Sequence, residues 1–177
     1  MMAEEKIRTA FERNQRALRL RPAIGRGTAA TTVRIREGLT CDIEEGPWKL
    51  VADMTEKNGG NGVGPKPGIY GRGALGSCLA IGYMMWAAKL GVPFASLEVQ
   101  IQADYDASAE YGVTDGSPSY SQIRYLVVIE SAAAEADVVR VLDTAEAHST
   151  YHDIFHRAQD LRREVRILSP AKGSRPL

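Results

Sequence analysis

Hydrophobic and polar positions change their period several times along the chain, and each change predicts a new element. In residues 4–20, apolar side chains recur at multiples of three to four positions between charges, which predicts an amphipathic helix. Residues 28–53 are rich in Thr, Val, Ile, Leu and Trp and are broken by two glycine-containing turns, which predicts an antiparallel meander. A glycine- and proline-rich loop at 58–68 follows the meander.

The second half of the chain opens with a long apolar segment. Residues 69–90 have the length of a helix and carry no charge between Gly73 and Ala88. A helix that is apolar on every face is expected in the protein interior. Alternation of apolar and polar residues then predicts half-buried strands at 97–103 and 123–129.

The remaining elements complete the predicted fold class. Helical spacing at 138–145 predicts a helix, and Thr150 with Asp153 predicts a capping box that opens a further short helix. Val165 and Ile167 predict a last strand. Strands and helices thus occur in separate runs, and this order predicts an α+β fold rather than the parallel sheet that is formed when single strands and helices alternate.

Composition narrows the function classes without pointing to a chemistry. The 177 residues suit a single domain, and 22 basic residues balance 22 acidic ones. A net charge of zero gives no global field for nucleic acid or an anionic membrane, so we expect neither as a partner. The N-terminal segment is charged and has no apolar core of a secretory signal, which predicts a cytoplasmic protein with reduced thiols.

The two cysteines are the first candidates for chemistry. Cys78 lies among small residues of the apolar helix, where a thiol is most often a small hydrophobic side chain. Reactivity there requires a nearby cation and an opening to solvent. Cys41 stands in a predicted strand, and nothing in its sequence context predicts activation. A disulfide between the two needs Cα atoms within about 7 Å, a distance that the sequence leaves open.

The three histidines, His148, His152 and His156, follow one another at four-residue steps. Such steps approach one helix face, as a zinc site requires, but each step drifts by about 40°. We therefore interpret them as helix-surface and cap residues, with His156 supporting the end of its helix, and we expect no metal and no cofactor. The sequence also lacks a P-loop, a Gly-x-Ser-x-Gly elbow and a His-Glu-x-x-His motif, which weakens several enzyme classes.

Two separated motifs give the chain a family resemblance. Residues 64–67 (Gly-Pro-Lys-Pro) and 73–78 (Gly-Ala-Leu-Gly-Ser-Cys) resemble the Gly-Pro-x-Pro…Ala-Leu-Gly-x-Cys signature of the OsmC/Ohr family. Residues 145–148 (Ala-Glu-Ala-His) and the four that follow match its second motif, Ala-Glu-x-x-Cys-Pro-Val-His or close to it. The resemblance covers about residues 31–169.

The resemblance implies a fold, an assembly and a chemistry. Family members are α+β homodimers in which antiparallel sheets from both chains surround two long buried central helices. We therefore expect an OsmC-like domain at 28–177 in an intertwined homodimer, preceded by a helical extension at 1–27. Peroxidase members reduce organic hydroperoxides with the first-motif cysteine, and the second-motif cysteine captures the resulting sulfenic acid as a disulfide.

Carried over position by position, the resemblance is incomplete. Cys78 matches the attacking cysteine, and Arg36 matches the thiolate-stabilising arginine, with Arg34 as a close alternative. The glutamate expected after the loop proline is absent, and Ser149 stands where the second cysteine is expected. We interpret Ser149 as a helix-start residue whose hydroxyl satisfies a free backbone N–H. Because a serine hydroxyl cannot form a disulfide, an oxidised Cys78 needs an external thiol or Cys41 for its reduction.

Two functions of different classes remain open. The first is a one-cysteine thiol peroxidase in oxidative stress defence, in which Cys78 and Arg36 act on organic hydroperoxides and an external thiol is the reductant. The second is a non-catalytic OsmC-fold dimer that binds a small hydrophobic molecule. The retained Cys78 favours the enzyme, whereas the missing glutamate and second cysteine favour the binding protein.

Overall fold

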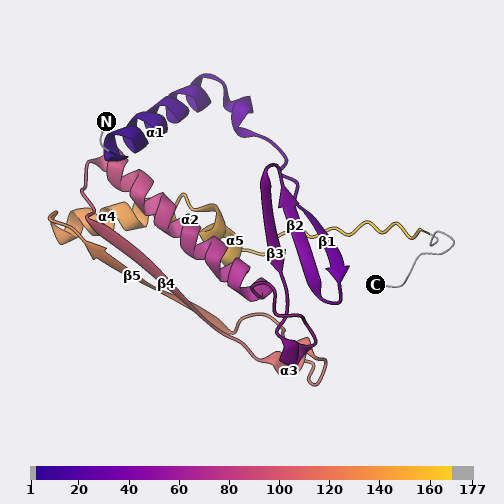
Figure 1. Ribbon diagram of the computed structural model, residues 1–177. Coiled ribbons are helices and arrows are strands. Elements are labelled where there is room, and N and C mark those ends of the chain that lie inside the picture. The colour runs from indigo at the N-terminus through magenta and orange to yellow at the C-terminus, as the bar shows by residue number, and fades with distance from the viewer. Residues whose placement is uncertain (1–2, 169–177) are drawn as a thin grey trace. The chain divides into compact units, whose positions relative to one another are not determined.

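The computed structural model describes residues 3–168, which combine helices with antiparallel strands (Figure 1). This mixture confirms the predicted α+β class. The chain divides into two compact units, one of residues 27–70 and 158–168, the other of residues 3–26 and 71–157. The predicted division into residues 1–27 and 28–177 stays a prediction, and residues 169–177 lie outside the described residues.

The first unit contains the predicted meander. β1 (Thr32–Glu37), β2 (Thr40–Glu45) and β3 (Trp48–Ala52) form an antiparallel sheet in the order β1-β2-β3. Gly38 and Gly46 occupy the two turns with φ of 55° and 54°, a left-handed conformation that a residue with a Cβ adopts only under strain. The sequence therefore sets the strand boundaries through its turn residues.

A buried carboxylate, Asp53, organises the glycine-rich loop after β3. Its Oδ2 accepts hydrogen bonds from the Thr40 hydroxyl and from the backbone amides of Asn61 and Val63, at 3.1, 3.1 and 3.2 Å. Its Oδ1 accepts from the Met54 amide at 2.7 Å. Burial raises the pKa of Asp53, but these hydrogen bonds to the ionised form outweigh burial and hold the pKa below its ordinary value. The loop is therefore folded around a charged group.

Close backbone contacts explain two loop glycines. A Cβ at Gly60 would lie 2.1 Å from the Met54 carbonyl oxygen, and one at Gly64 would lie 2.7 Å from the Val51 carbonyl oxygen. A short 3₁₀ turn, η2 (Glu56–Asn58), precedes both glycines. Glycine at the start of the first motif thus allows the loop to pass against β3.

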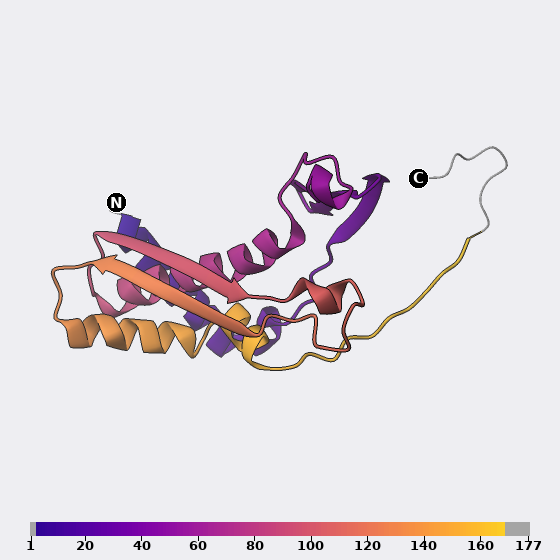
Figure 2. The ribbon, with the colours of Figure 1, turned by 90° about the horizontal axis from the view of Figure 1, so that it is seen from below.

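The second unit is built on a long helix and a hairpin. α2 (Pro67–Leu90) runs alongside β4 (Ser96–Asp104) and β5 (Gln122–Glu130), which are paired antiparallel over their full lengths (Figures 1 and 2). As the alternation predicts, one face of the hairpin is half-buried against α2 and the other is exposed. The centre of this core is formed by Leu75, Leu79, Tyr83 and Ala145.

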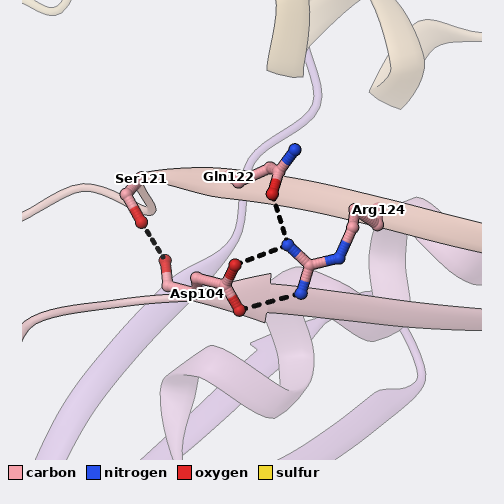
Figure 3. A network of polar contacts seen from close by, with 4 residues as sticks. All are labelled: Asp104, Ser121, Gln122 and Arg124. Carbon is pink, nitrogen blue, oxygen red and sulfur yellow. Dashed lines mark hydrogen bonds and ion pairs between the residues drawn. The ribbon is translucent and has the colours of Figure 1, made fainter.

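An exposed polar network links the two strands of the hairpin at the end where the connecting loop begins. Arg124 on β5 donates from Nη2 to Oδ1 of Asp104 on β4 at 2.9 Å, and Nη1 bonds both Oδ2 of Asp104 and the side chain of Gln122 (Figure 3). The Ser121 hydroxyl donates to the Asp104 carbonyl oxygen at 3.3 Å. The short helix α3 (Ala107–Glu110) lies in the loop that joins the strands. This network marks the point where strand pairing ends.

Three further helices belong to this unit: α1 (Ala3–Leu20), α4 (Glu135–Glu146) and α5 (Thr150–His156). A 3₁₀ turn, η1 (Pro22–Gly25), follows α1. Helix α1 is amphipathic, as its sequence pattern predicts, and it contacts α2 through Phe11 and Trp86, whose ring centroids lie 5.0 Å apart. None of the described helices has the length and apolar composition of a membrane span.

Two local predictions are wrong. The residue that caps α5 is Ser149 rather than Thr150, because the Ser149 hydroxyl accepts the free backbone amide of His152, which confirms the interpretation of Ser149 as a helix-start residue. Val165 and Ile167 form no strand and are 62% and 92% exposed. Alternation defines the two faces of a strand, but a strand also needs a partner edge, and none of the described strands pairs with this segment.

Helix α2 is buried on one side only within the described chain. Its buried residues follow the core side, whereas Gly73, Ser77, Ile81 and Met85 form an exposed stripe at four-residue steps. Ile81 is 61% exposed and Met85 is 38% exposed. The sequence predicts that α2 is buried on all faces, but one face is exposed in the described part of this single chain.

Candidate functional site

The second unit brings together two residues from the two sequence motifs. The Cys78 Sγ lies 3.4 Å from the Ser149 Oγ, although 71 positions separate them in the sequence. Cys78 is half-buried in the middle of α2, and Ser149 is 7% exposed at the start of α5. The first-motif cysteine thus faces the residue that stands in place of the second-motif cysteine.

The bonds of Ser149 determine what its hydroxyl can do. Its backbone is extended, as at a helix N-cap, and its Oγ accepts the His152 amide at 3.3 Å. This bond uses a lone pair of the oxygen and leaves the hydroxyl proton free to donate. A thiolate at Cys78 carries no proton, so in that state Ser149 would be the donor of the 3.4 Å contact.

A partly buried network of two tyrosines, a carboxylate and a histidine joins the same segments as this contact. Tyr83 is fully buried, and its hydroxyl donates to the Glu146 Oε1 at 2.7 Å. Burial, followed by the neighbouring Glu146 carboxylate, raises the pKa of Tyr83 and raises that of Tyr125 to about 12. The Tyr125 hydroxyl lies 3.4 Å from Nε2 of His152. Both tyrosines therefore stay protonated, and Tyr83 serves as a hydrogen-bond donor to Glu146.

The local sequence pattern does not predict this network. A signal was present, since Tyr83 places a hydroxyl inside an otherwise apolar stretch of helix, and a buried tyrosine hydroxyl usually finds a partner. Its acceptor, Glu146, belongs to the second motif but lies 63 positions away. No local pattern connects the two.

Two of the three histidines, His148 and His156, are exposed as the prediction of helix-surface and cap residues requires, whereas His152 is half-buried beside Tyr125. The His148 Nδ1 lies 2.7 Å from the Thr144 carbonyl oxygen, and the His156 Nδ1 lies 2.8 Å from the His152 carbonyl oxygen near the end of α5. An open hollow of about 450 Å³ runs over the junction of α4 and α5 beside these rings. Within residues 3–168, no group of His, Cys, Asp or Glu is arranged to hold a metal ion.

The remaining predicted residues lie in the first unit. On β1, Arg36 Nη1 lies 3.4 Å from an Asp42 carboxylate oxygen, and Arg34 Nη1 lies 3.0 Å from one of Glu44. Cys41 is a free thiol on β2, as Cys78 is on α2. The predicted role of Arg36 toward Cys78 stays a prediction.

Comparison with known proteins identifies the family. The profile of the family described as "OsmC-like protein" matches residues 59–163, more than half of the chain. No curated protein matches the chain.

Solved structures agree with this assignment at the level of the fold. An OsmC-like protein from Mycoplasma pneumoniae has a TM-score of 0.64 at 15% identity, over 73% of this chain and 88% of that one. A Legionella pneumophila protein described as an organic hydroperoxide resistance protein has a TM-score of 0.54 at 13% identity, over 72% and 90%. An Aquifex aeolicus hypothetical protein has a TM-score of 0.59 at 10% identity, over 74% and 89%. From the matched family profile, the chain belongs to the OsmC-like family.

Proposed function

We propose that this OsmC-like protein is a thiol-dependent organic hydroperoxide reductase with a single reacting thiol, Cys78. The observation that supports it best is the 3.4 Å contact between the Cys78 Sγ and the Ser149 Oγ. The contact joins the two motif positions that carry cysteines in the family's peroxidases. Cys78 is half-buried rather than fully buried, and partial exposure is typical of reactive cysteines.

The proposed reaction uses one thiol of the protein and two from solution. The Cys78 thiolate attacks an oxygen of the O–O bond, that bond breaks, and the products are a sulfenic acid and an alkoxide that takes up a proton to become an alcohol. An external thiol then condenses with the sulfenic acid to give a mixed disulfide and water. A second external thiol attacks this disulfide and releases Cys78 with a small-molecule disulfide.

Arg36 is the proposed cation for the Cys78 thiolate. Its ion pair with Asp42 is exposed on both sides, with side-chain exposures of 55% and 37%. Exposed ion pairs contribute at most about 1 kcal/mol, so Arg36 can exchange Asp42 for another anion at little cost. Arg34 has the same kind of carboxylate partner and is the matched control.

We further propose that the active protein is an intertwined homodimer in which α2 becomes a buried central helix. The exposed stripe of α2 borders an apolar groove of about 470 Å³, whose lining includes Ile7, Ile81, Met85 and Phe94. Light scattering should give the mass of a dimer, and Ile81→Glu should shift it toward the monomer. Val139→Glu on α4, also at an exposed apolar position, is the control, and an unchanged mass in Ile81→Glu would argue against this dimer.

The alternative function is a non-catalytic dimer that binds a small hydrophobic molecule. The apolar groove favours it, as do the absent glutamate and second cysteine. In this case Cys78 would react with peroxides no faster than free cysteine. Displacement of a bound hydrophobic fluorescent probe by added fatty acid would support this binding function.

Stopped-flow consumption of cumene hydroperoxide by the reduced protein separates the two functions. The wild type and Cys41→Ser should lose one thiol rapidly to a sulfenic acid detected by mass spectrometry, whereas Cys78→Ser should not. Arg36→Met should slow the reaction more than Arg34→Met does. A disulfide between Cys41 and Cys78 would identify Cys41 as the reductant, and a rate equal to that of free cysteine would refute the peroxidase.

A further inference from the structure

Two contacts join helix α2 to the segment between α4 and α5. One is the contact of the Cys78 thiol with the Ser149 hydroxyl. The other is the bond from the Tyr83 hydroxyl to the Glu146 Oε1, at 2.7 Å. Each pair takes one residue from α2 and one from the second motif. The two contacts therefore form neighbouring links between the same two segments.

The Tyr83–Glu146 link is the stronger of the two. Tyr83 is 0% exposed, so its hydroxyl has no water to replace Glu146, and hydrogen bonds to carboxylates are stronger than those between neutral groups. The thiol–hydroxyl contact is longer, at 3.4 Å, and involves a half-buried sulfur that is a weak hydrogen-bonding group. The stronger link is expected to set the spacing of the weaker one.

Glu146 is also connected to Ser149 through the backbone. The Ser149 amide donates to the Glu146 carbonyl oxygen at 3.1 Å, so the carboxylate and the serine belong to one hydrogen-bonded turn. A second tie comes from β5, where the Tyr125 hydroxyl lies 3.4 Å from His152, whose own amide bonds the Ser149 Oγ. The position of the Ser149 hydroxyl thus depends on both tyrosines.

We propose that Tyr83 and Glu146 are positioning residues whose hydrogen bond holds the Ser149 hydroxyl against Cys78, where it donates to the sulfur once the thiol ionises. The proposal rests on the proposed function in taking the Cys78 thiolate as the reacting group. It goes beyond the proposed function by assigning to the hydrogen-bonded pair Tyr83 and Glu146 control over how readily that thiolate forms.

Alkylation of Cys78 by iodoacetamide across a pH series, in a Cys41→Ser background, tests this without any peroxide. Tyr83→Phe keeps the ring and removes only the hydroxyl. It should slow alkylation at neutral pH by about tenfold, the lower end of the effect of one hydrogen bond to a charged group, and move the midpoint of the pH profile upward without changing the high-pH rate. A general loosening of the fold would instead raise the high-pH rate by exposing the sulfur.

A double-mutant cycle gives the decisive comparison. Ser149→Ala should have the same effect as Tyr83→Phe, and the double variant should be no slower than Ser149→Ala alone, because Tyr83 acts through Ser149. Tyr125→Phe should give a smaller effect that also vanishes in the Ser149→Ala background. Tyr120→Phe, which removes a hydroxyl bonded to Arg72 at 3.0 Å, is the matched control and should change nothing.

Additive slowing by Tyr83→Phe and Ser149→Ala would overturn the proposal, as would an unchanged pH midpoint in Tyr83→Phe. Peroxide consumption is measured separately. A Cys78 that shows the expected cycle in alkylation but no rapid reaction with cumene hydroperoxide would refute the proposed function and leave the positioning role standing.

Discussion

Replacing Ser149 by alanine removes one hydroxyl that makes two bonds of different kinds. As the N-cap of α5 it accepts the His152 amide at 3.3 Å, and beside Cys78 it lies 3.4 Å from the sulfur. The first bond stabilises a helix, whereas the second affects the ionisation of a thiol. A single substitution should therefore change stability and reactivity together.

The stability change can be sized from the geometry of α5. Loss of a serine N-cap costs about 1 kcal/mol, within a range of about 0.5–2 kcal/mol. α5 has 7 residues and none of them is buried, so little else holds its first turn, whereas Ser149 itself is only 7% exposed. For a chain of this length, about 1 kcal/mol lowers the Tm by about 2–4 °C.

Thermal unfolding and hydrogen exchange together measure this effect. Ser149→Ala should lower the Tm and speed amide exchange at His152, while Ser149→Thr, which keeps a hydroxyl, should restore most of both. Ser121→Ala is the matched control because the Ser121 hydroxyl bonds only a carbonyl oxygen at the exposed end of the hairpin (Figure 3). An unchanged Tm with unchanged exchange at His152 would refute the assignment of Ser149 as the cap.

Two further predictions concern the redox position and the organising carboxylate. Ser149→Cys, in a Cys41→Ser background, should form a disulfide with Cys78 after one equivalent of peroxide, seen as a mass loss of two hydrogens, whereas a persistent dimedone adduct would contradict it. Asp53→Asn should weaken the dependence of the Tm on pH in acid. Hydrogen bonds hold the pKa of Asp53 in the folded protein below its ordinary value of 3.8. The stability that ionised Asp53 contributes is therefore present above pH 3.8 and is lost as the pH falls through the lower, folded-state pKa. Unfolding followed between about pH 5 and pH 2 checks this, and equal slopes for both proteins would contradict it.

Much of the fold could be predicted because burial leaves a periodic trace in the sequence. Alternation at 97–103 and 123–129 gives β4 and β5, since each strand has one face against α2 and one against solvent. The same argument fails at Val165 and Ile167, because periodicity describes the faces of a strand and carries no information about which edge it would join.

Some features of the candidate site can likewise be predicted from the local sequence, whereas others depend on contacts between distant segments. The helix-start role of Ser149 is local, and the sequence indicates it through the residue type. The contact of Cys78 with Ser149 spans 71 positions and could be anticipated only through the family's two motifs. The bond of Tyr83 to Glu146 follows no period, and the hydroxyl-to-carboxylate pairing becomes visible only when the helices are placed.

Ser149 and the hydrogen bond between Tyr83 and Glu146 both suit a residue 149 that donates a hydrogen bond to the Cys78 thiolate. A resolving sulfur has to approach the attacking sulfur to a bond length of about 2.05 Å, so its segment must be able to move. A hydroxyl that only donates to a thiolate works best when its segment is held still, as the 2.7 Å bond from Tyr83 to Glu146 holds this one. The Tyr83–Glu146 bond holds residue 149 at hydrogen-bond distance from Cys78, 3.4 Å in the wild type, which is longer than an S–S bond. The disulfide in Ser149→Cys should therefore form faster when Tyr83→Phe is added, measured as the rate of sulfenic acid loss after a peroxide pulse. A slower rate in the double variant would contradict this restraint.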